Sequence, residues 1–146
     1  MDMPSLTRQS AHKHFIELVT AFYRDVGCEL PYFESDADSP IAFEVRVDDV
    51  KFSVGYDPAG TVPNLFVYCV FGIVPPHEEG PALRRLLERN LALAREHEAT
   101  YCIDGTTREV ACYMRKALAA LDVAALHEEM AYVAQQASQW RRDPFL

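Results

Sequence analysis

The sequence lacks the features of several large classes of protein. No apolar run approaches the length that a helix needs to span a bilayer, and the six glycines never cluster into a phosphate-binding loop. Basic residues are also few, since 14 lysines and arginines stand against 22 aspartates and glutamates, for a net charge of −8. Nucleic acids and anionic membranes attract basic surfaces, so neither is an expected partner. The N-terminus has no basic segment followed by an apolar one, so we expect no export signal and a cytoplasmic location.

Cysteine is present, but in no recognisable motif. None of the four cysteines forms a CxxC pair. Cys69 lies in an apolar stretch, and Cys102 and Cys112 alternate with apolar neighbours, so all three are expected in the core. Cys28 follows the end of a predicted helix, where the helix dipole does not stabilise a thiolate. A cysteine hydrolase is therefore the weakest function that we consider.

The histidines offer no metal site. His12 and His14 lie two residues apart on a predicted helix, point in different directions and are expected to be solvated. His77 and His127 each precede two glutamates, but neither has a second histidine at a metal-binding spacing. We therefore expect no metal, no cofactor, no catalytic residue and no enzyme activity.

Apolar residues at helical spacing predict three helices. The first is expected over about residues 6–26, because Gly27 suits a left-handed C-terminal cap. The second runs from Pro81, a favoured first-turn residue, to His97, and the third follows Asp122, a good N-cap. Residues 31–40 form a turn-rich loop, and residues 141–146 are expected to be a frayed end.

Alternating sequences predict five strands. Residues 41–57 read IAFEVRVDDVKFSVGYD, and a two-residue turn at Asp48 and Asp49 would place all seven alternating apolar side chains on one face. Residues 65–71, LFVYCVF, are apolar on both faces, which is typical of a central strand that is covered on both sides. Residues 100–104 and 108–114 read as a second hairpin, although 115–121 fit a helix.

The elements together predict an α+β fold. Their order is α-β-β-β-α-β-β-α, with an antiparallel five-stranded sheet and three helices in a single domain over residues 1–146. The first and third helices can cover one face of the sheet. The other face carries Phe66, Tyr68 and Val70, whose burial is worth about 1.5–3 kcal/mol each. The second helix, a second copy of the chain or a bound client could each provide that cover.

This combination resembles the Tir chaperone (CesT-like) family, the class I chaperones of bacterial type III secretion. The resemblance is carried by FEVRVDDVKFSVGYD (43–57), LFVYCVFGIVPP (65–76), LRRLLERNLAL (83–93) and ALDVAALHEEMAYVAQQASQWRR (120–142). It implies a bacterial cytoplasmic protein without enzyme activity or nucleotide. The expected partner is the N-terminal segment of a secreted effector, held in extended form and kept soluble and secretion-competent, with the secretion-system ATPase as a possible further partner.

The resemblance also implies two sets of site residues. A homodimer interface is expected on the second helix and the fourth strand, at Leu83, Leu86, Leu87, Asn90, Leu91, Tyr101 and Ile103. Client-binding residues are expected at Phe15, Val45, Phe52, Val54, Phe66, Tyr68 and Val70. Asn90, polar within an apolar stripe, either sets the register between two helices or lies at the rim. The alternative function is a cytoplasmic regulatory or sensory protein-binding module on the same scaffold.

Overall fold

The elements follow the predicted order. The computed structural model describes residues 3–30, 32, 40–58 and 63–145, with side chains from residue 9 onward. Its elements are α1 (Met3–Val26), β1 (Ile41–Val47), β2 (Val50–Asp57), β3 (Asn64–Ile73), α2 (Glu79–His97), β4 (Ala99–Ile103), β5 (Glu109–Ala117) and α3 (Val123–Arg142). Short 3₁₀ helices, η1 (Pro76–Glu78) and η2 (Leu118–Ala120), precede α2 and α3. The predicted α+β fold is confirmed, whereas the loop predicted over 31–40 falls largely outside the described residues.

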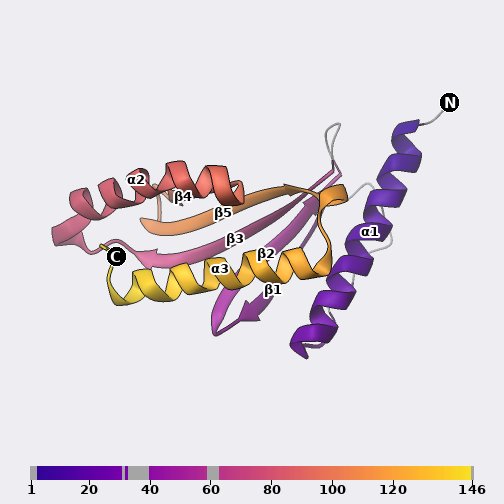
Figure 1. Cartoon of the computed structure of the whole chain (residues 1–146), viewed down its shortest axis with the longest axis horizontal. Helices are drawn as coiled ribbons and strands as arrows, with labels where there is room; N and C mark the ends of the chain where they lie inside the picture. Colours follow the sequence, from indigo (N-terminus) through magenta and orange to yellow (C-terminus); the bar gives the residue numbers. More distant parts are fainter. Residues whose placement is uncertain (1–2, 31, 33–39, 59–62, 146) are drawn as a thin grey trace.

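The five strands form one antiparallel sheet in the order β1-β2-β3-β5-β4 (Figure 1). The predicted hairpin register is confirmed, since Val47 pairs with Val50 and Val45 with Phe52. Asp48 and Asp49 have φ angles of 50° and 64°, the left-handed geometry that a two-residue hairpin turn requires. The alternation of the sequence and the geometry of the turn therefore agree on which side chains of β1 and β2 share one face of the sheet.

Two helices cover one face of this sheet. The side chains of Phe15 and Tyr23 in α1 contact Tyr56 and Phe43 of the first hairpin, with ring centroids 5.2 and 5.4 Å apart. α3 runs along the strands on the same face (Figure 1) and buries its apolar side there, with Trp140 against Phe71 near its end. The core therefore lies between α1, α3 and the inward face of the sheet.

The region after β4 differs in two respects from the prediction. β5 continues through Arg115 to Ala117, and only Leu118–Ala120 is helical, as a single 3₁₀ turn. The expectation that residues 141–146 fray is wrong for Arg141 and Arg142, which both lie in α3. The Arg141 guanidinium donates hydrogen bonds to the carbonyl oxygens of Phe71 and Val70, at 2.8 and 3.0 Å, and so ties the end of α3 to β3.

A bulge in β3 depends on Gly72. The pairing of β3 with β5 shifts between Val70 and Gly72, and Gly72 has a φ of +145°. A Cβ atom at this position would lie 3.2 Å from Cζ3 of Trp140. Glycine is therefore needed here for two reasons: the backbone has an unusual φ angle, and the Trp140 ring packs closely against it.

Gly72→Ala should destabilise the fold by more than about 1 kcal/mol, because alanine is strained at this φ and crowds Trp140. Urea unfolding followed by circular dichroism measures the change. The control is Gly80→Ala in α2, where an added Cβ meets nothing within 4 Å. Equal midpoints for the two variants would show that the bulge does not need glycine.

Candidate protein-binding surfaces

α2 lies beside the sheet, along its β4 edge, rather than across a face (Figure 1). The contact centres on Asn90, whose Oδ1 accepts a hydrogen bond from the Tyr101 N–H at 2.7 Å. The Nδ2 of the same amide donates to the Tyr101 carbonyl oxygen at 3.3 Å. Asn90 therefore binds both backbone groups of one β4 residue within its own subunit, a role that neither interpretation of the sequence included.

Polar contacts hold α2 against α3. The Arg89 guanidinium donates to the side-chain oxygen of Gln136 and lies 5.9 Å from the centroid of the Tyr101 ring. Near the end of α2, His97 stacks on Tyr132, with 3.9 Å between the ring centroids. These contacts turn one side of α2 toward α3 and leave its opposite side facing outward.

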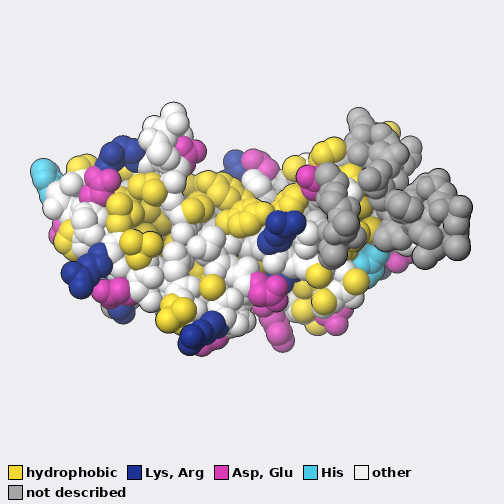
Figure 2. Space-filling model, turned by 90° about the horizontal axis from the view of Figure 1, so that it is seen from above, with side chains coloured by type: hydrophobic (Ala, Val, Ile, Leu, Met, Phe, Trp, Pro, Cys, Tyr) yellow, Lys and Arg dark blue, Asp and Glu magenta, His cyan; other side chains and the backbone are white. Residues whose placement is uncertain are grey.

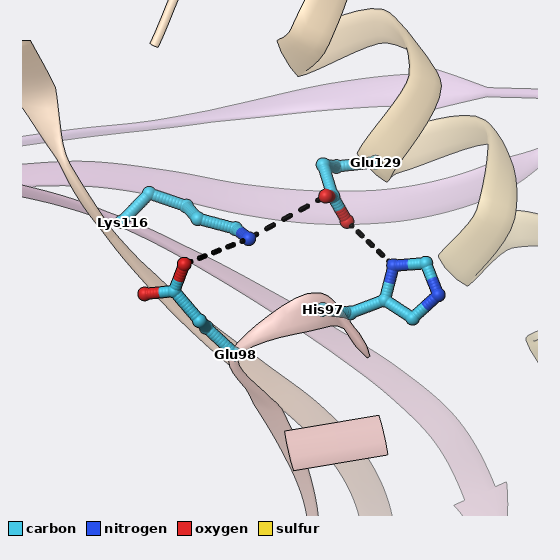
Figure 3. Close-up of polar contacts among 4 residues, drawn as sticks. All are labelled: His97, Glu98, Lys116 and Glu129. Atoms are coloured by element: carbon cyan, nitrogen blue, oxygen red, sulfur yellow. Dashed lines mark hydrogen bonds and ion pairs between the residues drawn. The ribbon is translucent and has the colours of Figure 1, made fainter. Parts of the chain in front are cut away.

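A network of four side chains completes this attachment (Figure 3). His97 Nδ1 lies 3.0 Å from Glu129 Oε2. The Lys116 ammonium lies 3.4 Å from Glu129 Oε1 and 3.5 Å from Glu98 Oε1. Because three of these side chains are mostly buried, their charges are screened less than on an open surface. The network links the C-terminal end of α2 to β5 and α3.

The leucine stripe of α2 is only partly buried. Leu86 and Leu93 are buried. Leu87 and Leu91 are instead 71% and 62% exposed. The reason is the position of α2 at the sheet edge, since a helix that packs beside a sheet presents half of a broad apolar stripe to the outside.

A shallow apolar groove of about 140 Å³ lies between α2 and the edge of the sheet. This α2–β4 groove is lined by Leu83, Leu86, Leu87, Asn90, Tyr101, Cys102 and Ile103. Every residue predicted for the dimer interface lines it except Leu91, which is exposed on α2, while Cys102 was not predicted. Viewed from the side on which α2 lies, the molecular surface carries a band of hydrophobic side chains (Figure 2).

The second surface is the face of the sheet that α1 and α3 leave uncovered, called here the open face. It contains Phe66, Tyr68 and Val70 of β3, all half-buried, and Tyr113 of β5, which the sequence interpretation missed. Tyr68 pairs with Tyr113 across the strands, and the Phe66 and Tyr113 rings stack 6.4 Å apart. Register alone could have identified Tyr113, because the residue opposite Tyr68 must share its face.

Phe66 occupies a site prepared by a glycine. Gly55 of β2 lies directly opposite Phe66, and a Cβ atom on Gly55 would approach the Phe66 ring to 3.1 Å. The ring therefore lies close over the glycine backbone.

The other predicted client-binding residues lie elsewhere. Phe15, Val45, Phe52 and Val54 are between 0% and 4% exposed, in the core between the sheet and α1 and α3. They offer no surface to a partner in this structure. The predicted client set is therefore split by the sheet, with Phe66, Tyr68 and Val70 alone on the open face.

The cysteines divide in the same way. Cys69 and Cys112 are buried opposite each other on β3 and β5, and burial raises the pKa of each thiol to about 12. The prediction that Cys102 lies in the core is wrong, because its side chain points to the open face and is exposed. Burial of part of the side chain, and the nearby Asp104, raise the pKa of Cys102 as well.

Histidine 14 also departs from its predicted role. Its Nε2 donates to the carbonyl oxygens of Leu118 and Leu121, at 3.2 and 3.3 Å, so the side chain joins α1 to the turn before α3 rather than being solvated. Among the residues that the structure describes, no group of three or more His, Cys, Asp or Glu side chains could hold a metal ion. In the same part of the chain, no helix combines the length and apolarity needed to cross a membrane.

Comparison with known proteins identifies the family. Residues 17–141 match the Tir chaperone protein (CesT) family, and the chain belongs to it. No curated protein sequence matches the chain. The described fold is that of the type III secretion chaperones.

Solved structures agree in fold at low sequence identity. A chain of the HopA1–SchA chaperone–effector complex superposes with a TM-score of 0.64 at 16% identity, over 91% of this chain and 97% of that chain. A chain of the ExsC–ExsE complex gives 0.63 at 19% identity, over 98% and 96%. The structure of the Yersinia pestis type III secretion chaperone SycH with a stable fragment of YscM2 gives 0.62 at 14% identity, over 84% and 96%.

Thiol reactivity should separate the cysteines. Cys28, which is exposed, should react with a chromogenic disulfide at pH 8, whereas Cys69 and Cys112 should react only on unfolding. The reason is that thiols with a pKa of about 12 hold almost no thiolate at this pH and are also inaccessible. Mass spectrometry of the labelled peptides, with and without denaturant, measures the order. Labelling of Cys69 as fast as Cys28 in the native protein would contradict the burial described.

Proposed function

We propose that this chain is a type III secretion chaperone that binds the N-terminal segment of a secreted effector in extended form. By covering that segment it keeps the effector soluble and competent for secretion. Family membership supports this function, as does the similarity to a chain solved in a chaperone–effector complex. The observation that carries the proposal is an apolar sheet face that α1 and α3 do not cover.

The client-binding site is the open face. Phe66, Tyr68, Val70 and Tyr113 form an apolar strip across β3 and β5, and their half-exposure leaves area for a partner to bury. An extended segment without its own core can place alternate side chains against such a strip. Burial of apolar area at about 25 cal/mol per Å² provides the driving force. The net charge of −8 favours a client segment of opposite charge.

The assembly is a homodimer through the α2–β4 groove and the exposed side of α2. Leu87 and Leu91 are large apolar side chains with most of their area in solvent, which a second copy would bury. A two-fold dimer places the same patch on both subunits, and this patch is apolar in its centre with Asn90 as its polar member. Two copies double the number of open faces available to one long client segment.

The remaining roles follow from this proposal. The protein acts by binding in the bacterial cytoplasm, without a cofactor or a catalytic step, and the secretion-system ATPase is a further partner. The regulatory or sensory alternative would bind a folded partner. Limited proteolysis of a co-expressed effector distinguishes the two, because a secretion chaperone protects only the N-terminal segment. Protection of a folded effector domain instead would favour the alternative.

Leu87→Asp should dissociate the dimer while leaving the subunit folded. The Leu87 side chain is 71% exposed in the subunit, so an aspartate there costs the folded subunit little. Its carboxylate loses water only when a partner covers it, and that desolvation costs on the order of several kcal/mol. Light scattering measures the mass, and circular dichroism checks the fold. Ala92→Asp on the same helix is the control, since Ala92 is exposed, lies outside the groove and faces another side of α2 than Leu87 and Leu91. An unchanged dimer for Leu87→Asp would remove α2 from the interface.

Tyr68→Asp should weaken client binding at least tenfold, about the factor expected from losing burial of one large apolar side chain. Calorimetry with a peptide that spans the protected effector segment measures the affinity. Gln135→Asp is the control, because Gln135 is exposed on α3, on the other side of the sheet from Tyr68. Equal losses for the two variants would indicate a general effect of charge rather than contact with Tyr68.

A further inference from the structure

The bulge in β3 changes which side chains reach the open face. Before the bulge, even-numbered residues such as Val70 point to the open face and odd-numbered residues are buried in the core. Strict alternation would therefore direct Gly72 outward and Ile73 inward. The register shift after Val70 reverses this order. Gly72 lies against the Trp140 ring on the core side. Ile73, the next residue, is 62% exposed.

The register places Ile73 on the open face. Ile73 pairs with Glu109, which lies on the same side of β5 as Tyr113, because residues an even number apart in a strand share a face. Ile73 therefore lengthens the apolar strip that begins at Phe66. At about 3.3 Å per residue, the strip from Phe66 to Ile73 is roughly 20 Å long. An extended segment of about seven residues covers this length and has the same spacing of alternate side chains.

The two ends of this strip carry opposite charges. At one end, Phe66 pairs with Arg115 of β5, which is exposed. At the other end, Ile73 pairs with Glu109. Asp104 adds a second carboxylate there, since its N–H donates to the Glu109 carbonyl oxygen at 2.9 Å across the β4–β5 turn. An occupant of the strip therefore meets a cation at one end and carboxylates at the other.

The electrostatic surroundings of Tyr68 agree with this placement. Burial of part of the side chain raises the pKa of Tyr68, and negative charge at its neighbours raises the pKa further; these neighbours include Cys102, Asp104 and Glu109. The two carboxylates therefore act on the open face, where the Tyr68 side chain lies.

Arg115 and Glu109 can pair with an occupant. The charged residue beside each of them in sequence is already paired, Lys116 with Glu129 at 3.4 Å and Arg108 with the first residue of α2. Among the residues that the structure describes, the side chains of Arg115 and Glu109 themselves form no ion pair. Their charges are therefore available to a bound segment.

The remaining charges of the open face do not cancel this difference. Glu44 of β1 and Lys51 of β2 form an ion pair at 3.0 Å, which leaves little net charge between them. Arg46 lies on the edge strand β1, two strands away from β3. The difference in charge along the strip is therefore set by Arg115 and Glu109.

We propose that the open face binds its client segment in one direction, with an acidic residue of the segment beside Arg115 and a basic residue beside Glu109. This inference rests on the proposed function and specifies the segment that the open face recognises. The segment is extended, places alternate apolar side chains along the strip from Phe66 to Ile73, and carries unlike charges at its two ends. The reversed placement brings like charges together at both ends and is disfavoured.

Paramagnetic NMR with a designed peptide measures this direction. In the peptide, valine alternates with serine between an aspartate at one end and a lysine at the other, both termini are blocked, and a nitroxide label is attached beside the aspartate. We expect the label to broaden the amide signals of Phe66 and Arg115 and to spare those of Ile73 and Glu109. In the double variant Arg115→Glu with Glu109→Lys, the broadening should move to the Ile73 end. Equal broadening at both ends of the natural protein, or no reversal in the folded double variant, would overturn the proposal.

A charge cycle with single variants gives a second measurement. Glu109→Gln should weaken binding of this peptide about two- to fivefold, the range expected for an exposed ion pair. It should not affect a peptide in which glutamine replaces the lysine. Glu128→Gln is the control, because Glu128 is exposed on α3, on the other side of the sheet. Equal weakening of both peptides by Glu109→Gln would show that Glu109 does not contact the lysine.

Ile73→Ser tests the end of the strip. Because Ile73 is 62% exposed, the substitution removes contact area for the peptide at little cost to the fold. Binding should weaken at least about threefold, since apolar area is no longer buried there. A peptide with serine in place of the valine nearest the lysine should not respond. An equal response of the two peptides would place the end of the strip at Val70.

The same titrations distinguish this proposal from the proposed function. A peptide that changes no amide signal on the open face would contradict the open face as the client-binding site. A peptide that binds there without a preferred direction would contradict only the role of Arg115 and Glu109.

Discussion

The position of α2 at the edge of the sheet is the constraint on which the two candidate surfaces depend. A helix with several leucines would ordinarily pack across a sheet face and bury them. Here the amide of Asn90 holds α2 to the backbone of Tyr101, and Arg89 and His97 hold it to α3. Because α2 remains at the edge, one sheet face stays uncovered and half of the helix stripe stays outside.

The buried apolar side chains of this subunit are therefore concentrated on one face of the sheet. The inward face, α1 and α3 form a core with side chains as large as Phe15, Tyr56 and Trp140 almost fully buried. The side chains of Phe66, Tyr68 and Val70 on the open face lie outside this core. The open face and the exposed side of α2 are therefore available for intermolecular contacts, which is the property that a binding protein requires.

Much of the fold could be predicted from the sequence, because local periodicity decides it. Alternation fixed the register around Asp48 and Asp49, and the doubly apolar run at 65–71 indicated the central strand. The exposure of Cys102 could not be predicted in this way, since an apolar pattern does not reveal which face lacks a covering helix. The roles of Asn90 and His14 also escaped prediction, because each binds backbone atoms of a segment distant in sequence.

The candidate site shows the same limit. Seven residues were assigned to client binding as one set, yet sheet geometry sends Phe52 and Phe66 to opposite sides. Cys102 is at once a wall of the α2–β4 groove and a member of the uncovered sheet surface. An occupant of either region would therefore contact a side chain that the other region also presents. In the proposed assembly, the free energy by which one occupant changes the binding of the other is the same in both directions, so self-association and cargo affinity are linked quantities.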